Sequence, residues 1–309
     1  MASAPAIVFF AFVAFVAVLT AGRLVRDLAA LVRRQKPGGD RVFAVALYVV
    51  AVLGLLCILW GWLVEPYTLS ITREVIVSSR VRAKVRIVHI SDTHCDAKTR
   101  LEPRLAAVVN AEKPDLILFT GDAMNSRAGA ENFVKAMAPM KARLGKFAIW
   151  GNWDGPVPGF EDACARAGFK VLAGFSEEFD KAGEPLTVTG VQFSEPGKAA
   201  YIASSLPESG YHILLYHSPD LLEIPAVEEG YDLYLCGHTH GGQVRMPWYG
   251  ALITLSRHGK KYEMGRYQRG DLTVFVSRGI GMEGGPAPRV RFLCRPEIAV
   301  LDVVPEQGR

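Results

Sequence analysis

The strongest constraint on the fold of this chain is a series of polar motifs, each of which follows directly on a short apolar run. The apolar runs cover residues 85–90, 115–119, 147–150, 211–216 and 231–236. The motifs that follow them are Asp92-Thr93-His94, Gly121-Asp122, Gly151-Asn152-Trp153-Asp154, His217 and Gly237-His238-Thr239-His240. Short apolar runs of this kind predict buried strands. Because open α/β sheets gather their functional groups at the carboxyl ends of strands, the motifs are expected to converge.

The side chains in these motifs are carboxylates, an amide and imidazoles. Divalent metal ions accept such a mixture of hard and borderline ligands, and two ions together can clamp a phosphate and activate a water molecule. Taken singly, each motif has a plainer interpretation, with Asp92 and Asp122 as caps of helices or turns and the histidines as satisfied core residues. When the motifs are taken together, the burial of so many polar groups without a metal would be costly, which favours a metal site.

In this order, the motifs resemble those of the calcineurin-like metallophosphoesterase superfamily over residues 85–305. The resemblance implies a metal-dependent phosphoesterase with two divalent ions, which can be Mn, Fe or Zn. It assigns Asp92, His94, Asp122 and His240 to one ion, and Asp122, Asn152, His217 and His238 to the other, with Asp122 as the bridge. It also makes Asp122, Asn152 and His238 the expected catalytic residues. His89 and His212 lie inside or at the start of apolar runs and are expected to be structural.

The rest of the chain agrees with an α/β fold. Helix-like stretches near residues 102–113, 131–143 and 160–168 separate the first strands, so the first half predicts successive strand-helix units. The later half is rich in strands, at residues 185–193, 211–216, 231–236, 272–277 and 297–304. With the resemblance, this order implies the four-layer sandwich of the family, in which two mixed sheets are flanked by helices.

The sequence departs from the family pattern at two positions. Trp153 stands where many members have a histidine thought to protonate the leaving group, and Asn125 stands where many have an acidic residue that orients it. A general acid contributes ~10²–10⁴-fold and matters most for a basic leaving alkoxide. The joint change therefore favours a phosphoanhydride or an activated phosphodiester as substrate. Trp153 either forms an aromatic wall for that substrate or packs beneath the metal loop.

The C-terminal part supplies further candidates for substrate contact. The tail at residues 276–281 resembles the membrane-associated bacterial branch, similar to phosphodiesterases and UDP-2,3-diacylglucosamine pyrophosphatases. Arg278, Arg289 and Arg291 are candidates for gripping a second phosphate or a headgroup, and the alternative is ordinary surface charge. His258 lies in a polar stretch and is either a surface residue or a substrate contact that takes over the role of the missing acid.

Residues 5–22 and 42–64 contain no charged side chain. A bilayer core needs ~20 apolar helical residues, so the two segments predict a membrane hairpin over residues 1–64. For the first, shorter segment a buried core helix and a cleavable signal peptide are alternatives, although the positive region that a signal peptide needs is missing before it. Residues 65–84 are expected to form a linker and an edge strand before the catalytic domain.

The basic charge of the chain is confined to the stretch between the two apolar segments. The net charge of that stretch is +4, which equals the net charge of the whole chain. Its charged residues are Arg23, Arg26, Arg33, Arg34, Lys36 and Arg41 against Asp27 and Asp40. Residues 65–309 are therefore balanced, which argues against a nucleic acid polymer as partner. The positive-inside rule places the basic loop in the cytoplasm and the catalytic domain on the extracytoplasmic side of a bacterial inner membrane. A second basic cluster, at residues 80–86, faces either lipid headgroups or solvent on a strand.

Two functional hypotheses follow. The first is a membrane-anchored, dinuclear metal-dependent phosphohydrolase that cleaves a phosphodiester or phosphoanhydride of a lipid or nucleotide-linked lipid. The second is a membrane receptor or scaffold that binds metal and phosphate without turnover, because Trp153 replaces the expected acid. Retention of every inferred metal ligand favours the enzyme. The five cysteines show no paired spacing, so there is no disulfide framework to interpret.

Overall fold

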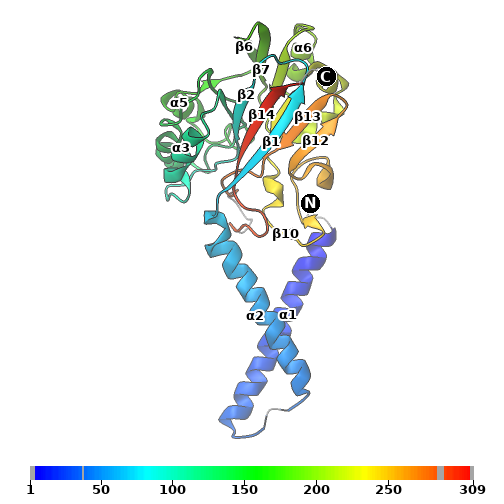
Figure 1. The fold of residues 1–309 in the computed structure, drawn as a ribbon. Coiled ribbons are helices and arrows are strands. Elements are labelled where there is room, and N and C mark those ends of the chain that lie inside the picture. The colour runs from blue at the N-terminus through cyan, green and yellow to red at the C-terminus, as the bar shows by residue number, and fades with distance from the viewer. Residues whose placement is uncertain (1–3, 37, 284–288, 307–309) are drawn as a thin grey trace. The chain divides into compact units, whose positions relative to one another are not determined.

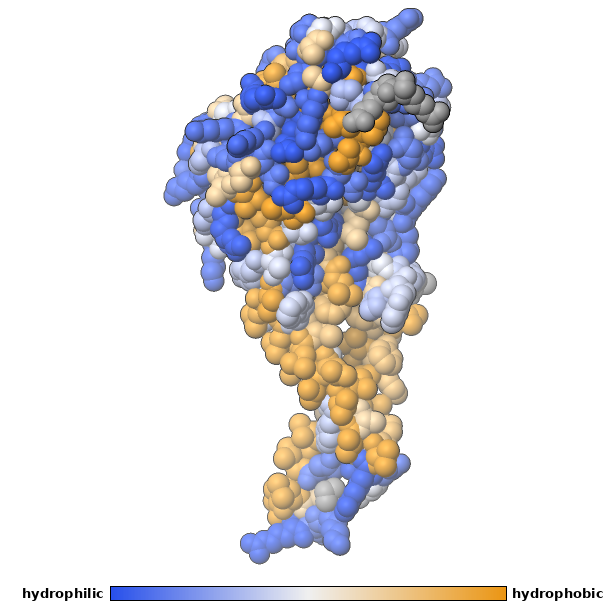
Figure 2. Space-filling model, in the orientation of Figure 1, coloured by the Kyte–Doolittle hydropathy of each residue, from blue (hydrophilic) through white to orange (hydrophobic). Residues whose placement is uncertain are grey.

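The computed structural model describes residues 4–36, 38–283 and 289–306, which divide into two units at Val64 and Glu65. The first unit is a hairpin of α1 (Ala4–Val32) and α2 (Arg41–Leu63) (Figure 1). Both helices are long and apolar enough to cross a membrane. Most of their large apolar side chains are exposed, and Figure 2 shows hydrophobic residues over most of the visible surface of the hairpin. This weakly suggests that the chain associates with a membrane.

Helix α1 is longer than the uncharged segment 5–22 because it continues through the charged residues to Val32. Charged residues such as arginine are good helix formers, and no glycine or proline interrupts this stretch after Gly22, so the loss of apolar character does not end the helix. Within the hairpin, Arg23 is paired with Asp27 at 3.0 Å, and the hydroxyl of Tyr48 donates to the same carboxylate over 2.7 Å. Part of the basic stretch is therefore helical and neutralised rather than loop.

The second unit contains two six-stranded mixed sheets, as the sequence predicts. The first sheet has the order β1 (Ser70–Ser78), β14 (Glu297–Pro305), β2 (Val85–Ile90), β3 (Leu116–Phe119), β4 (Gly145–Ala148), β5 (Lys170–Val171). The second has the order β12 (Gly265–Arg269), β13 (Leu272–Val276), β9 (Leu233–Cys236), β8 (Tyr211–Leu215), β7 (Glu184–Gly190), β6 (Phe175–Lys181). In the first sheet β2 to β5 are parallel, and in the second β7, β8, β9 and β13 are parallel. A small antiparallel pair, β10 (Arg245–Met246) and β11 (Gly250–Ala251), lies outside both.

Helices cover the outer face of each sheet and complete four layers. The helices are α3 (Glu102–Ala111), α4 (Ala130–Met137), α5 (Phe160–Arg166), α6 (Lys198–Ala203) and α7 (Pro225–Gly230). One apolar core joins α3, α4 and α5 to the first sheet, a second lies between the sheets, and a third joins α6 and α7 to the second sheet. Adjacent residues in β2 divide between cores, with Ile87 facing the other sheet and Val88 facing the helices. This alternation is what period-two side chains in a central strand produce.

Two of the helices end earlier than the periodicity predicts. Helix α3 stops at Ala111 and α4 stops at Met137, and in each case a proline follows within three residues. A proline disfavours helical backbone at the residue before it, so Pro114 and Pro139 terminate helices whose apolar pattern continues.

The basic cluster at residues 80–86 is paired with carboxylates of the same unit. Arg80 lies 3.3 Å from Asp232, and Arg82 lies 3.0 Å from Glu184. Lys84 and Arg86 both lie 2.7 Å from Asp302. These ion pairs favour the plainer of the two interpretations, an ordinary charged strand surface.

Candidate metal centre

The predicted ligands all follow the carboxyl ends of parallel strands. Asp92 and His94 come after β2, Asp122 after β3, Asn152 after β4, His217 after β8, and His238 and His240 after β9. Except for half-buried Asn152, every one of these side chains is buried. The polar motifs of both sheets thus lie at the same end of the sandwich, as is usual for open α/β sheets.

The backbone of these motifs is strained in a consistent way. Asp92, His94, Asp122, His238 and His240 have positive φ angles between 40° and 69°. Left-handed backbone is uncommon for residues other than glycine and costs of order 1–3 kcal/mol at each position. Such clusters mark sites where function fixes the backbone.

Two glycines allow the strand ends to approach each other closely. A Cβ on Gly121 would collide with the backbone of Gly151, and one on Gly237 would collide with Ser91 and with the carboxylate of Asp92. The glycines that precede the ligands in the sequence motifs are therefore required by the contact between neighbouring strand ends.

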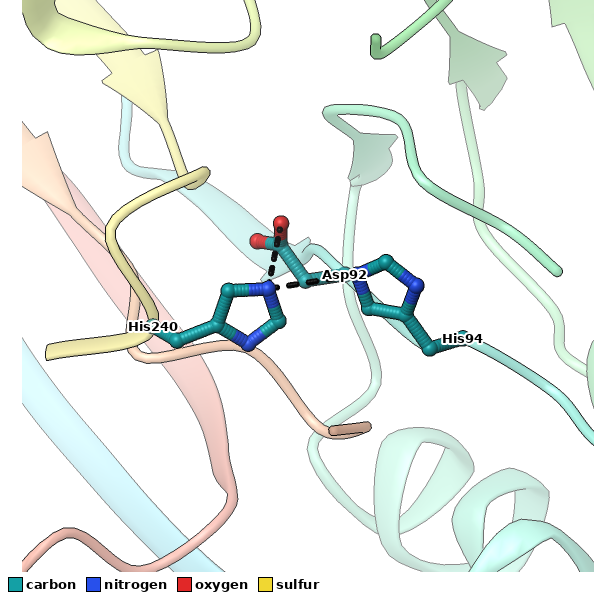
Figure 3. Close-up of side chains that lie close together, drawn as sticks. All are labelled: Asp92, His94 and His240. Carbon is teal, nitrogen blue, oxygen red and sulfur yellow. Dashed lines mark hydrogen bonds and ion pairs between the residues drawn. The ribbon is translucent and has the colours of Figure 1, made fainter. Parts of the chain in front are cut away.

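Asp92, His94 and His240 form one group whose ligand atoms lie within 4.8 Å of one another. In Figure 3 both imidazole rings point toward the Asp92 carboxylate, His94 from the loop after β2 and His240 from the loop after β9. The two Nε2 atoms are 3.2 Å apart, and His240 Nε2 lies 3.5 Å from Asp92 Oδ1. Two imidazole nitrogens bound to one tetrahedral ion would lie roughly 3.3 Å apart, so this spacing fits a shared metal.

Asp92 also belongs to a second group, with Asp122 and His217. His217 Nε2 lies 3.2 Å from Asp122 Oδ2 and 3.9 Å from Asp92 Oδ1. Asp122 Oδ2 is in turn 3.5 Å from His94 Nε2, so this carboxylate reaches a histidine of each predicted ligand set. Both Asp122, the expected bridge, and Asp92 are positioned to be shared by two ions.

Asn152 and His238 meet beside the second group. Asn152 Oδ1 lies 2.9 Å from His238 Nδ1, and the ring of His238 is 5.0 Å from that of His217. The backbone N–H of His238 points at the carboxylate of Asp92, 3.1 Å from Oδ1. The structure therefore brings all seven predicted ligands into one connected cluster.

The hydrogen bonding of His217 fits a metal ligand. Its Nδ1 lies 2.7 Å from the carbonyl oxygen of Thr120, which can only accept, so Nδ1 carries the proton. Its buried Nε2 makes no well-aligned hydrogen bond in the described part of the chain and faces the carboxylates of Asp122 and Asp92. A histidine held by a carbonyl at one nitrogen, with the other nitrogen turned toward carboxylates, fits the usual arrangement of a metal-binding imidazole.

The charges of the site also favour a cation. Burial and the neighbouring Asp122 raise the pKa of Asp92 to about 7. Burial opposes the charged form of His217, but Asp122 and Asp92 outweigh it and raise the pKa of His217. Burial lowers the pKa of His94 and of His238 to about 4, so both rings are neutral, as ligands must be. The two buried carboxylates thus favour positive charge close to them, which a divalent ion would supply.

Asp154 supports the site from within the loop after β4. Its buried carboxylate accepts backbone N–H bonds from Asp122 at 2.7 Å, Ala123 at 2.9 Å and Gly151 at 2.8 Å. Burial and the charge of Asp122 raise its pKa to about 7. The sequence analysis named Asp154 only as part of a motif, and its place after Gly-Asn was the available signal.

Trp153 packs at the edge of the first group. Its ring meets that of His94 edge-on at 5.9 Å, and its backbone N–H donates to Asp122 Oδ1 over 2.9 Å. Its indole N–H donates to Glu283 over 3.3 Å. Burial and the charge of Asp122 raise the pKa of Glu283. No sequence signal pointed to Glu283, because only the fold brings it beside Trp153.

The side-chain amide of Asn125 is used in hydrogen bonds. Its Nδ2 donates toward the carbonyls of His94 and Met282 and toward Asp96 Oδ1, at 3.1–3.2 Å. This position holds the loop after His94 to the segment that follows β13.

The three predicted arginines lie in different environments. Arg291 is fully buried and donates to the carbonyls of Gly281, Cys294, Arg278 and Gly279, with Nη2 3.4 Å from His240 Nδ1. Arg278 is paired with Glu297 at 2.6 Å. Arg289 is half exposed and lies 2.9 Å from Asp96. Contrary to the expectation of substrate contact, Arg291 holds the backbone beside His240, because a guanidinium can satisfy several buried carbonyls at once.

His258 belongs to a different part of the unit. It lines a cavity of about 460 Å³, and among the described residues that line this cavity none is a predicted metal ligand. Its ring packs edge-on against Tyr262 at 5.0 Å. His89, within hydrogen-bond distance of Thr120 at 2.9 Å, and His212, within the same range of the carbonyl of Pro207, occupy structural positions.

Phe193 is a further residue that the sequence analysis missed. Its ring lies 5.6 Å from that of His238 and 5.7 Å from that of His217. Phe193 follows β7 and lies outside the polar motifs, so only its spatial position marks it as part of the wall of the site.

Comparisons with known proteins agree with this geometry. Residues 85–242 match the profile of the calcineurin-like phosphoesterase family. YkuE of Bacillus subtilis, an uncharacterised metallophosphoesterase, is 32% identical over 251 residues, 77% of this chain and 86% of its own length. The phosphodiesterase YaeI of Escherichia coli is 30% identical over 239 residues, 72% of this chain and 83% of its own.

A more distant relative is the UDP-2,3-diacylglucosamine pyrophosphatase LpxG of Chlamydia muridarum. It is 23% identical over 323 residues, which cover 83% of this chain and 96% of its own length. The family profile, the bacterial relatives and the clustered ligands agree with one another: the chain belongs to the calcineurin-like phosphoesterase family and is a metal-dependent phosphoesterase.

Proposed function

We propose that this chain is a membrane-anchored phosphohydrolase with a dinuclear metal site, which cleaves a phosphodiester or phosphoanhydride in a lipid or nucleotide-linked lipid. The observation that carries the proposal is the single buried cluster in which Asp92 and Asp122 stand among four histidines. Retention of the whole ligand set favours turnover over a receptor or scaffold role.

The seven ligands divide between two ions in this proposal. Asp92, His94, Asp122 and His240 hold one ion, and Asp122, Asn152, His217 and His238 hold the other. Divalent ions at such a site stabilise charge on the phosphate oxygens and lower the pKa of the attacking water. In hydrolysis the oxygen of a water molecule would bond to phosphorus as the bond to the leaving group breaks, one proton of that water would pass to solvent, and the leaving group would depart as an anion.

The residues around the cluster support an activated leaving group. The imidazole that many family members have at position 153 is replaced by an indole, whose single N–H is bonded to Glu283. An indole does not titrate in the range of a general acid, so Trp153 does not protonate a leaving alkoxide. A phosphate or nucleoside monophosphate leaving group needs no such proton.

The anchor supports a substrate that resides in a membrane. Helices α1 and α2 keep the catalytic unit within reach of a bilayer, which a soluble substrate would not require. The charged residues near the hairpin loop place that loop in the cytoplasm by the positive-inside rule, and the catalytic unit then lies on the extracytoplasmic side. A nucleotide-linked lipid that is made in the cytoplasm would need the opposite orientation.

Turnover by the detergent-solubilised full chain tests the proposal. We expect hydrolysis of bis-p-nitrophenyl phosphate with Mn²⁺, Fe²⁺ or Zn²⁺, and faster hydrolysis of lipid-linked diesters or anhydrides than of soluble alkyl phosphomonoesters. The Asp122→Ala variant serves as the inactive control. Absence of turnover with every metal would favour the receptor or scaffold, and activity of a compartment-specific reporter at the C-terminus decides which side the catalytic unit occupies.

A further inference from the structure

The catalytic unit carries a group of exposed apolar residues on a short hairpin and two adjoining segments. We define the hairpin patch as Met246, Trp248, Tyr249, Ile253, Leu255 and Leu293, all of which are exposed. Trp248, in the turn between β10 and β11, is fully exposed. Soluble surfaces bear scattered apolar residues, but a group that includes a fully exposed tryptophan marks an interaction site.

The backbone of the patch is held in an unfavourable conformation. Trp248 and Leu293 have φ angles of 62° and 53°, in the left-handed region that bulky residues avoid. Trp248 is fully exposed and Leu293 about half exposed, so contacts with the described residues offset little of this strain. Burial against something outside the unit would offset it.

The patch lies beside the point where the catalytic unit is joined to α2. The backbone N–H of Cys294, next to Leu293, donates to the buried side chain of Glu65, the first residue of this unit. Phe292 pairs with the start of the hairpin, since the N–H of Arg245 donates to its carbonyl over 3.0 Å. In Figure 1, β10 and the beginning of β1 lie at the same end of the catalytic unit, and α6 lies at the other end.

The connection between Glu65 and the end of α2 is short. Helix α2 ends at Leu63, two residues before Glu65, and consecutive Cα atoms are about 3.8 Å apart, so the two residues are separated by less than about 8 Å. Trp60, Trp62 and Tyr67 flank this point and are exposed. Tryptophan and tyrosine concentrate at the membrane interface, so Glu65 would lie at interface depth if α2 spans a bilayer.

The charges around the patch suit an anionic lipid surface. Lys260 Nζ lies 4.1 Å from the centre of the Tyr249 ring and is paired with Glu263. Arg257, Lys261 and Arg295 are exposed on the neighbouring segments and carry the basic charge that faces solvent. Basic side chains near a bilayer surface are attracted to anionic headgroups.

From these observations we infer that the hairpin patch inserts into the interface of the same bilayer that α2 spans. This inference rests on the proposed membrane anchor. The hairpin is also joined to the predicted metal site, because Arg245 Nη1 donates to the carbonyl of Gly241 over 2.8 Å, directly after His240. Docking through the patch would therefore place the predicted metal site near the membrane surface.

Fluorescence of a probe at position 248 tests the inference in the full chain. The background is Cys57→Ala, because the other four cysteines are buried. An environment-sensitive nitrobenzoxadiazole probe is attached to Trp248→Cys or, as a matched control, to Tyr201→Cys on α6, a similarly exposed aromatic position. Both proteins are reconstituted into phosphatidylcholine and phosphatidylglycerol vesicles that contain nitroxide-labelled lipid.

We expect several-fold stronger quenching at position 248 than at position 201. Equal, weak quenching in vesicles that carry the protein through flotation would overturn the docking surface but leave the anchor intact. A shielded probe at 248 without lipid quenching would assign the patch to a second copy or another protein, and also overturn the inference. Failure to float overturns the anchor and the docking together, while hydrolysis of bis-p-nitrophenyl phosphate by the same sample reports separately on catalysis.

Discussion

The indole N–H of Trp153 donates to Glu283 Oε1 over 3.3 Å and joins the loop after β4 to the segment after β13. Glu283 is half-buried, and its pKa is raised by burial and by the charge of Asp122. The pair lies beside His94 at the predicted metal site, at the position where the family pattern in the sequence analysis has a histidine. A histidine introduced at position 153 would therefore lie beside Glu283.

Trp153→His should increase hydrolysis of substrates with basic leaving groups more than of substrates with acidic ones. Glu283 is placed to orient the new imidazole, and a general acid contributes up to ~10²–10⁴-fold for a basic leaving group. A plot of rate against leaving-group pKa should be steep for the native chain and flatter for the variant. Trp153→Phe is the control and should keep the steep slope. A native chain that is already insensitive to leaving-group pKa would mean that another acid acts, with Glu283→Gln as the next variant.

Adding Asn125→Asp to this variant should be harmful rather than helpful. The amide of Asn125 donates toward three oxygens, those of His94, Asp96 and Met282. A carboxylate there would face acceptors without a proton to donate, so we expect a loss of about 1–3 kcal/mol in stability. Thermal unfolding of the single variant, compared with the native chain, measures this.

Asp122→Ala should abolish activity and leave the fold intact. Asp122 reaches His94 and His217 at 3.5 and 3.2 Å, so its loss affects both predicted ions. Elemental analysis of the purified variant should show reduced metal content, and the circular dichroism spectrum should match that of the native chain. His258→Ala, in a separate cavity, should retain both metal and activity. More than a few per cent of native rate in Asp122→Ala would contradict the two-metal assignment.

Asp154→Ala should destabilise the catalytic unit and lower activity. The substitution leaves three buried backbone N–H groups without an acceptor, and each unsatisfied donor costs about 1–3 kcal/mol. Asp162→Ala is the control, because its exposed ion pair with Arg166 contributes about 0–1 kcal/mol. Denaturant midpoints in detergent compare the two variants. Equal midpoints would show that Asp154 does not hold the loop.

Because of Asp302, the stability of the fold should depend on pH in the acid range. Hydrogen bonds from Arg86 and Lys84 lower the pKa of Asp302 in the folded chain, against a modest opposing effect of burial. A carboxyl with a lowered folded pKa stabilises the fold above its unfolded pKa of about 3.9 and loses that contribution as pH falls through the folded value. The difference between the native chain and Asp302→Asn should be about 1 kcal/mol at pH 7, because Lys84 is half exposed, and should shrink below pH 4. Unfolding midpoints at pH 7, 5 and 3 measure it, and a constant difference would contradict the assignment.

Local patterns were sufficient for the main architecture and the family. Short apolar runs that end in polar motifs predicted the strands, because a strand buried on both faces is recognisable within a few residues. The resemblance to the family implied the two mixed sheets. The same patterns named the seven side chains that the structure brings into one cluster, and their assignment to two ions stays a prediction. Two uncharged segments predicted the apolar helices by length alone.

Contacts between distant segments were decided only by tertiary structure. The sequence analysis named Arg291 as a candidate for gripping a phosphate, with surface charge as the alternative, whereas packing buries it against four backbone carbonyls beside His240. It did not find Glu283 beside Trp153, or Glu65 under Cys294, because those partners are 130 and 229 residues apart in the chain. The end of α1 was also missed, since charge ends an apolar segment but not a helix. Sequence patterns report which face or strand end a residue occupies, and only the packing of the sheets decides which residues then meet.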